Sequence, residues 1–313
     1  MHRWLLWTLL AVVCWGVWAL LGKLVGDSIS PALTQALSTI GLAPVMVMLG
    51  LSIRLKNIRS EPLALEQARS RPISVRFAGP LFAFVAGILT CLGNVSYYTV
   101  LNSGAKAATV VPLTALYPFV TILLAMLLLR ERLNLLQLSG LGLSLVAIYL
   151  FNVQQEQGLV SSWLLVALIP VVLWGIAGLL QKLTTNHCSS ELSTLWFLSA
   201  FVPVAAWIVL AKGFPPPLTA GTWVIVTALG LTFALGNFGL LAAFANNGKA
   251  SIITPLAGLY PIVSIPIAIV LLHERISWRE GVGILLALVS IAALSYESPE
   301  AKPKIAQLHA TQK

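Results

Sequence analysis

Apolar runs of about 20 residues, separated by short polar or charged segments, follow one another along the whole chain. A run of that length forms a helix that can cross the ~30 Å hydrocarbon core of a bilayer. The pattern therefore predicts an all-α polytopic membrane protein with ten transmembrane helices. The predicted spans are residues 4–23, 31–53, 77–101, 105–129, 134–152, 161–182, 191–211, 221–244, 249–272 and 277–296.

An internal repeat divides these spans into two groups of five. Lys106–Arg132 aligns without a gap with Lys249–Arg275, and 14 of the 27 columns are identical. Trp4–Leu24 aligns with Trp163–Leu183, with 12 of 21 identical. Because five is odd, the two groups should cross the membrane in opposite senses, as an inverted-topology five-plus-five repeat. The predicted units are 1–153 and 160–296, and we expect the polar tail at 297–313 to be disordered.

Composition and charge agree with a membrane protein. Of the 313 residues, 58% are hydrophobic and 9% are charged, whereas a soluble domain has about 25% charged residues. The net charge of +9 lies mostly in short loops, so it indicates topology and not nucleic-acid binding. With the N-terminus inside, 14 Lys and Arg are cytoplasmic and 5 are outside, which places both termini in the cytoplasm. The compact size and short linkers favour a bacterial inner (plasma) membrane.

Two spans carry paired prolines, Pro112 and Pro118 in 105–129 and Pro255 and Pro261 in 249–272. Each interior proline removes a backbone hydrogen bond and kinks a helix. In hydrocarbon the freed carbonyl group needs a partner from protein or water, which favours a cavity. The duplicated pairs predict hinges beside a cavity, although bent packing helices are the alternative.

Four large aromatic residues occupy the middle of their spans: Trp15, Trp174, Tyr117 and Tyr260. Tryptophan and tyrosine normally lie at the membrane interface, where their polar atoms stay hydrated. At the midplane these atoms need a partner, so an inward orientation is favoured over a lipid-facing one. We predict that they bind substrate; helix packing with an internal hydrogen bond is the alternative.

Asn94 and Asn237 lie about two-thirds along the spans 77–101 and 221–244. A buried amide there can contact substrate or form a hydrogen bond between helices. The span 77–101 has further polar side chains at Thr90, Ser96, Tyr97, Tyr98 and Thr99. We therefore predict that this span forms the more polar side of the pocket, and that Asn94, Tyr98 and Asn237 contact the substrate.

Four lysines lie at helix ends and are candidate charges at the mouths of the cavity. Lys23 and Lys182 end their spans, where a cation favours the helix dipole and the long stem can reach the interface. Lys106 and Lys249 begin theirs, where a cation opposes the dipole, so they are candidates for attracting anionic solutes.

Several kinds of site are missing from the sequence. None of the ten carboxylates lies deep in a span, which disfavours a cation pump with a central acidic residue. Glu131 and Glu274 follow their spans, where we expect them to pair with arginine or to fix a turn. The three unspaced cysteines form no metal or disulfide pattern. No catalytic motif is present, so we expect neither an enzyme nor a cofactor.

The repeated motifs resemble those of the EamA type of the drug/metabolite transporter superfamily. They are Trp15-Gly16 with Lys23, the run Val111–Pro118 and the stretch Leu128–Leu133, each with a counterpart in the second half. The resemblance covers about residues 4–296. It implies a central cavity lined largely by the first, third, fourth, sixth, eighth and ninth helices of an inverted repeat. It also implies the transport of small metabolites such as amino acids, often outward.

The predicted function is a secondary transporter that moves a small organic metabolite, by efflux, through alternating access to a cavity at the midplane. Two alternatives remain: an exchanger or importer of an anionic metabolite such as a sugar phosphate or nucleotide sugar, and a non-transporting membrane scaffold or receptor. The expected partners are a small-molecule substrate and the lipid bilayer, without nucleic acid, for a monomer or homodimer.

Overall fold

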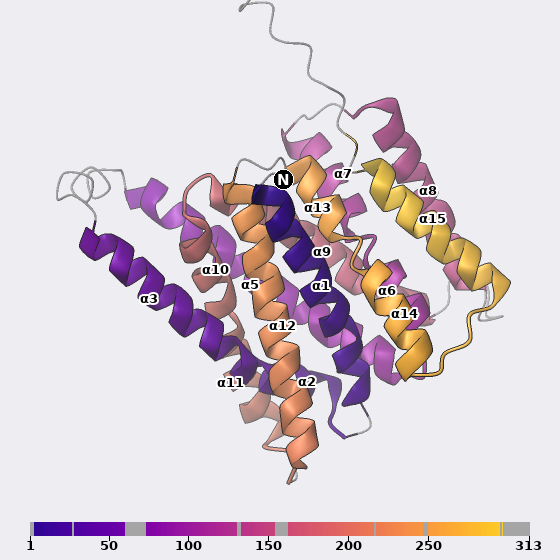
Figure 1. Cartoon of the computed structure of the whole chain (residues 1–313), viewed down its shortest axis with the longest axis horizontal. Coiled ribbons are helices and arrows are strands. Elements are labelled where there is room, and N and C mark those ends of the chain that lie inside the picture. Colours follow the sequence, from indigo (N-terminus) through magenta and orange to yellow (C-terminus); the bar gives the residue numbers. More distant parts are fainter. Residues whose placement is uncertain are drawn as a thin grey trace, which may run out of the picture.

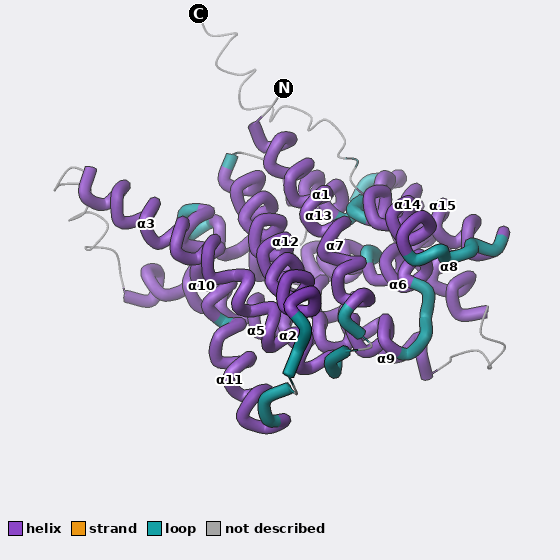
Figure 2. Tube along the Cα trace, turned by 60° about the horizontal axis from the view of Figure 1, so that its bottom comes forward, coloured by secondary structure: helices purple, strands orange, loops and turns teal. Residues whose placement is uncertain are grey.

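The computed structural model describes residues 3–26, 28–59, 73–129, 133–153, 162–215, 217–246, 250–294 and 296. Within these residues every regular element is a helix (Figures 1 and 2). The first half contains α1 (Arg3–Leu24), α2 (Pro31–Ser38), the 3₁₀ helix η1 (Thr39–Leu42), α3 (Ala43–Arg59), α5 (Ile73–Asn102), α6 (Ala107–Thr114), α7 (Tyr117–Leu129) and α8 (Leu135–Val153). The second half contains α9 (Ser162–Thr185), α10 (Ser190–Ser199), α11 (Phe201–Lys212), α12 (Ala220–Ala245), α13 (Ala250–Ala257), α14 (Pro261–Leu271) and α15 (Trp278–Leu294). Lys249, Glu131 and the predicted tail at 297–313 lie outside the described residues.

Eight helical stretches in the described part of the chain are long and apolar enough to cross a membrane. They are Arg3–Leu24, Pro31–Arg54, Phe77–Asn102, Ala107–Leu128, Trp163–Thr185, Ser190–Lys212, Ala220–Ala245 and Ile253–Leu271. The two other predicted spans coincide with α8, which has a shorter apolar part at Leu135–Leu150, and with the 17-residue α15. A 17-residue helix rises about 25 Å, near the lower limit for a crossing. The all-helical class is confirmed, and the count of ten crossings stays a prediction.

Both spans with the duplicated proline pairs are broken where the sequence predicts it. The span 105–129 divides into α6 and α7 after Thr114, and the span 249–272 divides into α13 and α14 after Ala257. Each break lies between the two prolines of its pair, because the second proline lacks the N–H that would continue the helix. At the first break the chain tightens into a bond from the Leu116 amide to the Leu113 carbonyl, at 3.2 Å.

The two breaks face each other inside the protein. A methyl group on Gly258 would lie 3.3 Å from Cγ of Pro118 and 3.4 Å from the Ala115 carbonyl oxygen. The irregular backbone of one half therefore contacts that of the other. This placement suits a membrane protein, where non-helical backbone must be buried in protein or line a cavity.

The first helix of each half packs mainly on helices of the other half. α1 packs along α12 and touches α14, while α9 packs along α5 and touches α7. The last helices of the two halves, α8 and α15, lie side by side at one edge of the molecule (Figure 1). There the Ser144 and Ser290 hydroxyl groups are 2.5 Å apart, and Ser290 also donates to the Gly140 carbonyl at 2.8 Å.

The 30-residue helix α5, about 45 Å long, defines the two ends of the protein. At one end, Lys23 of α1 donates to the carbonyl of Ala105, just beyond α5. At the other, Thr184 of α9 donates to the carbonyl of Gly79 at 2.6 Å. We call these the Lys23 end and the Lys182 end. α1 and α9 therefore finish at opposite ends of α5.

Candidate functional site

A cavity lies between the two halves, at about the middle of the long helices. Its lining comes from α1, α5, α7, α9, α12 and the break before α14, and consists of Trp15, Trp18, Thr90, Asn94, Tyr117, Trp174, Ala177, Gln181, Phe233, Asn237 and Tyr260. All of these side chains are buried. The cavity measures about 50 Å³, which is room for a few water molecules at roughly 10–15 Å³ each.

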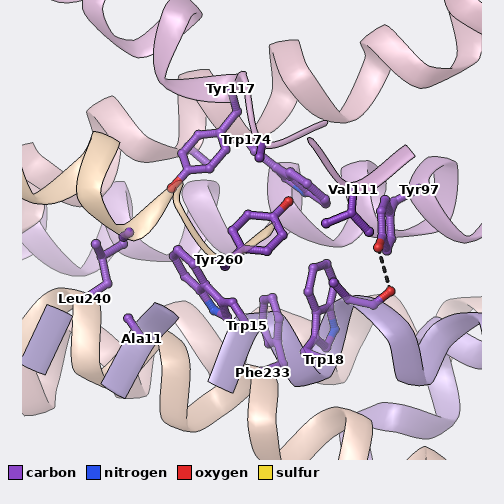
Figure 3. Packing of buried hydrophobic residues seen from close by; sticks show 14 of the residues in the cluster. Ala11, Trp15, Trp18, Tyr97, Val111, Tyr117, Trp174, Phe233, Leu240 and Tyr260 are labelled. Carbon is purple, nitrogen blue, oxygen red and sulfur yellow. Dashed lines mark hydrogen bonds between the residues drawn. The ribbon is translucent and has the colours of Figure 1, made fainter. Parts of the chain in front are cut away.

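The centre of the cavity is built from two matching sets of contacts. Trp15 meets Tyr260 edge to face, with ring centroids 6.3 Å apart at 84°, and Trp174 meets Tyr117 with the same distance and angle. Figure 3 shows these four rings facing one another. They pair the first helix of each half with the broken helix of the other half.

Glycines make room for the two indoles. A methyl group on Gly236 would lie 2.5 Å from Nε1 of Trp15, and one on Gly93 would lie at the same distance from Nε1 of Trp174. Any larger residue at either position would displace the ring. Each of these glycines directly precedes a cavity asparagine, so the Gly-Asn pairs place an indole and an amide side by side.

Five buried polar atoms around the cavity have no hydrogen-bond partner among the residues that the structure describes: Nε1 of Trp15 and Trp174, the hydroxyl groups of Tyr117 and Tyr260, and Oδ1 of Asn94. The Tyr260 hydroxyl has the Thr114 side chain as a neighbour, but their geometry is not that of a hydrogen bond. A buried polar group without a partner costs about 1–3 kcal/mol. Such a concentration around one cavity is typical of a place where a ligand or water completes the hydrogen bonds.

The second asparagine is already bonded within the protein. Asn237 donates from Nδ2 to the Phe233 carbonyl at 2.9 Å, and its Oδ1 accepts from Nε2 of Gln181 at 3.3 Å. Asn237 thus joins two helices, which is the packing alternative. Oδ1 of Asn94 has no partner among the described residues, and its contact with substrate stays a prediction.

Of the seven residues predicted to bind substrate, Tyr98 alone is not part of the lining. Its hydroxyl accepts a hydrogen bond from Nε1 of Trp18 at 3.0 Å, and its ring lies against Gly22. Tyr98 therefore packs behind Trp18, because Gly22 leaves room for a ring there. The other six predicted residues do line the cavity, and their role in binding stays a prediction.

Charged side chains gather at the Lys23 end, away from the cavity lining. Glu274, in the turn between α14 and α15, accepts from the amides of Ala107 and Ala108, both at 2.8 Å. Its carboxylate also lies 3.4 Å from Nζ of Lys23. The sequence suggested that Lys106 opposes the dipole at the start of α6. The carboxylate of Glu274, from the other half, caps this helix start, which is the charge that the dipole favours there.

Lys106 has its own partner in the same cluster. Its Nζ donates to both carboxylate oxygens of Glu280 at 2.9 Å and to the Arg275 carbonyl at 2.9 Å. Glu280 also accepts from the Ser277 amide at 2.6 Å, and its own amide donates to the Ser277 hydroxyl. Ser277 and Glu280 therefore form a capping box at the start of α15.

These contacts correct two expectations from the sequence. Lys106 is not a free charge awaiting an anion, because Glu280 neutralises it. Among the described residues, Glu274 pairs with a lysine and a helix start instead of an arginine. We call Lys23, Lys106, Glu274 and Glu280 the ion-pair cluster. Lys182 lies in the last turn of α9 at the opposite end, and Lys249, the counterpart of Lys106, lies outside the described residues.

Several residues of the site were missed by sequence reasoning. Trp18, Ala177, Gln181 and Phe233 line the cavity but differ from their counterparts in the other half, so the repeat did not mark them. Glu280 was also overlooked, although the Ser-x-x-Glu spacing before an apolar run signals a capping box. Among the described residues no group of His, Cys, Asp or Glu could hold a metal ion.

Comparison with known proteins identifies the family. The model of the EamA-like transporter family matches two segments, residues 2–153 and 161–296, which together cover nearly all of the chain. The chain belongs to the EamA-like transporter family. This EamA-like protein is therefore an integral multi-pass membrane protein and a membrane transporter, in agreement with the resemblance to the drug/metabolite transporter superfamily.

Two further similarities were found for this EamA-like protein. It is 35% identical over 72 residues to the uncharacterized protein MJ1333.1 of Methanocaldococcus jannaschii, a match that covers 23% of this chain and 52% of that protein. The chain thus matches about half the length of this relative. A crystal structure of another protein has a TM-score of 0.62 at 19% identity, covering 92% of this chain and 94% of that one. This second likeness concerns the fold.

Proposed function

We propose that the protein moves a small organic metabolite that carries no net charge, such as an amino acid or a related compound, by alternating access to the central cavity. The observation that carries this proposal is the set of unpartnered polar atoms around a lining that contains no charged side chain. Indole and phenol groups can donate to a carboxylate, while the Asn94 carbonyl oxygen can accept from an ammonium group. The rings supply apolar contact area for the rest of the solute.

The alternative of an anionic metabolite gains no support from the site. A phosphate carries a high charge, and a buried anion needs a cation or several donors nearby. Lys23 and Lys106 are both engaged by carboxylates. We therefore place the amino-acid class first.

Alternating access requires two halves that can exchange roles. We propose ten membrane crossings in an inverted five-plus-five repeat. In support, α1 and α9 end beside opposite ends of α5, and the two Trp–Tyr contacts share one geometry. The paired breaks at Pro112–Pro118 and Pro255–Pro261 are the proposed hinges. In this scheme the described conformation is closed at the Lys23 end, where the ion-pair cluster joins the two halves.

We propose both an orientation in the membrane and a direction of transport. The positive-inside rule places both termini in the cytoplasm, so the Lys182 end faces the cytoplasm and the Lys23 end faces outward. We propose that the protein resides in a bacterial inner membrane and exports its solute. A conformation closed at the outer end is one that can load from the cytoplasm.

The direct test is transport by purified protein in proteoliposomes, with a panel of radiolabelled amino acids and, as the competing class, sugar phosphates. We expect saturable exchange of at least one amino acid and none of the phosphates. Transport of the phosphates alone would favour the anionic alternative. Failure of folded protein to move any solute of the panel would overturn the proposal.

Replacing Tyr117 or Tyr260 with phenylalanine tests whether the cavity hydroxyls bind the solute. Since neither hydroxyl has a hydrogen-bond partner in the described part of the chain, their removal should leave the thermal stability unchanged or slightly higher. A lost hydrogen bond to the solute, worth about 0.5–1.5 kcal/mol, should raise KM by about two- to tenfold. The measurement is the concentration dependence of transport, together with the melting temperature in detergent.

Tyr98→Phe is the matched control. Its hydroxyl is bonded to Trp18 and lies outside the cavity lining, so this change should lower the stability and leave KM nearly unchanged. If Tyr117→Phe and Tyr260→Phe behave as Tyr98→Phe does, the tyrosine hydroxyls do not contact the solute.

A further inference from the structure

The two halves match at the centre of the cavity but differ on either side of it. Trp18 of α1 aligns with Ala177 of α9, three residues after the matched tryptophans of the repeat. Phe233 of α12 aligns with Thr90 of α5, four residues before the matched asparagines. All four side chains line the same cavity, so one pair of positions carries large rings and the equivalent pair carries small side chains.

The large pair packs within a cluster of aromatic rings. The rings of Trp18 and Phe233 have centroids 5.5 Å apart. Trp18 also lies 5.2 Å from the ring of Tyr97 and 5.8 Å from that of Trp174. The Tyr98 hydroxyl accepts a hydrogen bond from the indole nitrogen of Trp18. Figure 3 shows Trp18 and Phe233 side by side. We call the rings of Trp18 and Phe233 the ring layer. It lies on the Lys23 side of the cavity centre, because Trp18 is one turn beyond Trp15 in the direction of Lys23.

The equivalent positions of the other half carry no aromatic residue. The counterparts of Tyr97 and Tyr98 are Leu240 and Leu241. One turn after Ala177, Gln181 stands at the position equivalent to Gly22, and its amide donates to Oδ1 of Asn237. Ala177, Thr90 and Gln181 therefore give the cavity smaller and more polar side chains toward the Lys182 end.

From this asymmetry we infer that the solute binds off the centre of the repeat, between Ala177 and Thr90, and that these two small residues set the largest solute the protein accepts. The amides of Gln181 and Asn94 then contact the polar part of the solute. The inference rests on the proposed function, because it takes the central cavity as the transport site. It adds which side of that cavity is used and which residues select for size.

The test is the transport of a size series of amino acids, from glycine and alanine to leucine and phenylalanine, by the Ala177→Leu variant in proteoliposomes. One methylene group in a pocket changes discrimination by roughly 10–200-fold. We therefore expect the KM of the largest transported solute to rise at least about tenfold and that of the smallest to change by less than about twofold. Thr90→Leu should act in the same way.

Ala206→Leu is the matched control, because Ala206 is exposed on α11. It makes the same chemical change where the side chain faces away from the interior, and it should leave the whole size series unaltered. Equal losses for small and large solutes in Ala177→Leu, or no change at all, would overturn the inference.

A second measurement does not depend on transport or on tolerance of leucine. In a chain with Cys14, Cys91 and Cys188 replaced by alanine, we expect Ala177→Cys to react with methyl methanethiosulfonate. Ala19→Cys should stay unreactive, because Ala19 is fully buried outside the lining. Equal rates would overturn the inference. If the wild type moves no solute but Ala177→Cys reacts selectively, the proposed function fails while the off-centre space stands.

Discussion

Replacing Glu274 with glutamine is expected to lower transport by about 10- to 100-fold and to open the Lys23 end. The Glu274 side chain is 9% exposed and contacts Lys23, and it caps two amides at the start of α6. These contacts come from the two halves of the chain, so they hold the halves together at this end. Their loss should destabilise the closed conformation relative to the open one.

The size of the effect follows from the kind of bond that is lost. A hydrogen bond to a charged group contributes about 1.5–3 kcal/mol, roughly twice a neutral one. A glutamine side chain has one carbonyl oxygen for the two amide donors of Ala107 and Ala108. Its NH₂ group would face an N–H group, and two donors form no hydrogen bond. A shift of about 1.5–3 kcal/mol changes the ratio of closed to open protein by about 10- to 100-fold. Since a transport cycle must visit both conformations, such a bias slows it.

The measurement compares initial transport rates with the reactivity of a cysteine placed at Thr90. Glu191→Gln is the control, since it makes the same chemical change at the first turn of α10, where Glu191 accepts from the neighbouring Ser190. It should retain most of the transport activity. A Glu274→Gln protein with wild-type rates and wild-type thiol reactivity would show that the ion-pair cluster has no part in the conformational change.

The second large effect is expected at Gly230, where alanine should destabilise the protein severely. A Cβ atom at Gly230 would overlap the Ser38 carbonyl oxygen and lie 2.9 Å from Cα of Gly41. The clash is with backbone atoms at the end of α2 and in η1, so no change of a side-chain rotamer relieves it. Glycines of this kind let membrane helices approach closely, and overpacking costs about 1–3 kcal/mol or more.

We expect Gly230→Ala to give little monodisperse protein and a lower melting temperature in detergent. Gly142→Ala is the matched control, because no atom lies within 4 Å of the position that its Cβ would take. It should be as stable as the wild type or slightly more so, since alanine favours a helix by about 0.5–1 kcal/mol over glycine. Equal stability of both variants would contradict the close contact between η1 and α12.

The sequence predicts the local features of this protein well. The helix breaks lie between paired prolines, whose covalent geometry acts within a few residues. A single proline is not enough, since α5 and α9 continue through Pro80 and Pro170. The positions of Trp15, Tyr117 and Asn94 at the cavity could be predicted because each has an identical counterpart. Symmetric positions meet at the interface of two equivalent halves, so identity in the repeat marks the centre.

The remaining features depend on which distant segments meet. The contact of Lys23 with Glu274 joins residues about 250 positions apart, and no pattern along the chain indicates that the turn after α14 reaches the start of α6. Tyr98 was misplaced for the same reason, since only the packing against Gly22 shows that it lies behind Trp18. Trp18 and Ala177 occupy the same column of the aligned repeat but are different residues. Identity between the halves therefore does not mark this position, although it lines the cavity.

Alternating access to the central cavity is tested most directly by the accessibility of one cavity position from each side of the membrane. Thr90→Cys, in a chain without its native cysteines, is exposed to a membrane-impermeant methanethiosulfonate in vesicles of either orientation. We predict modification from both sides, and that Glu274→Gln speeds the reaction from the Lys23 side while slowing it from the Lys182 side. Modification from one side only, or rates that rise together from both sides, would contradict alternating access to the central cavity.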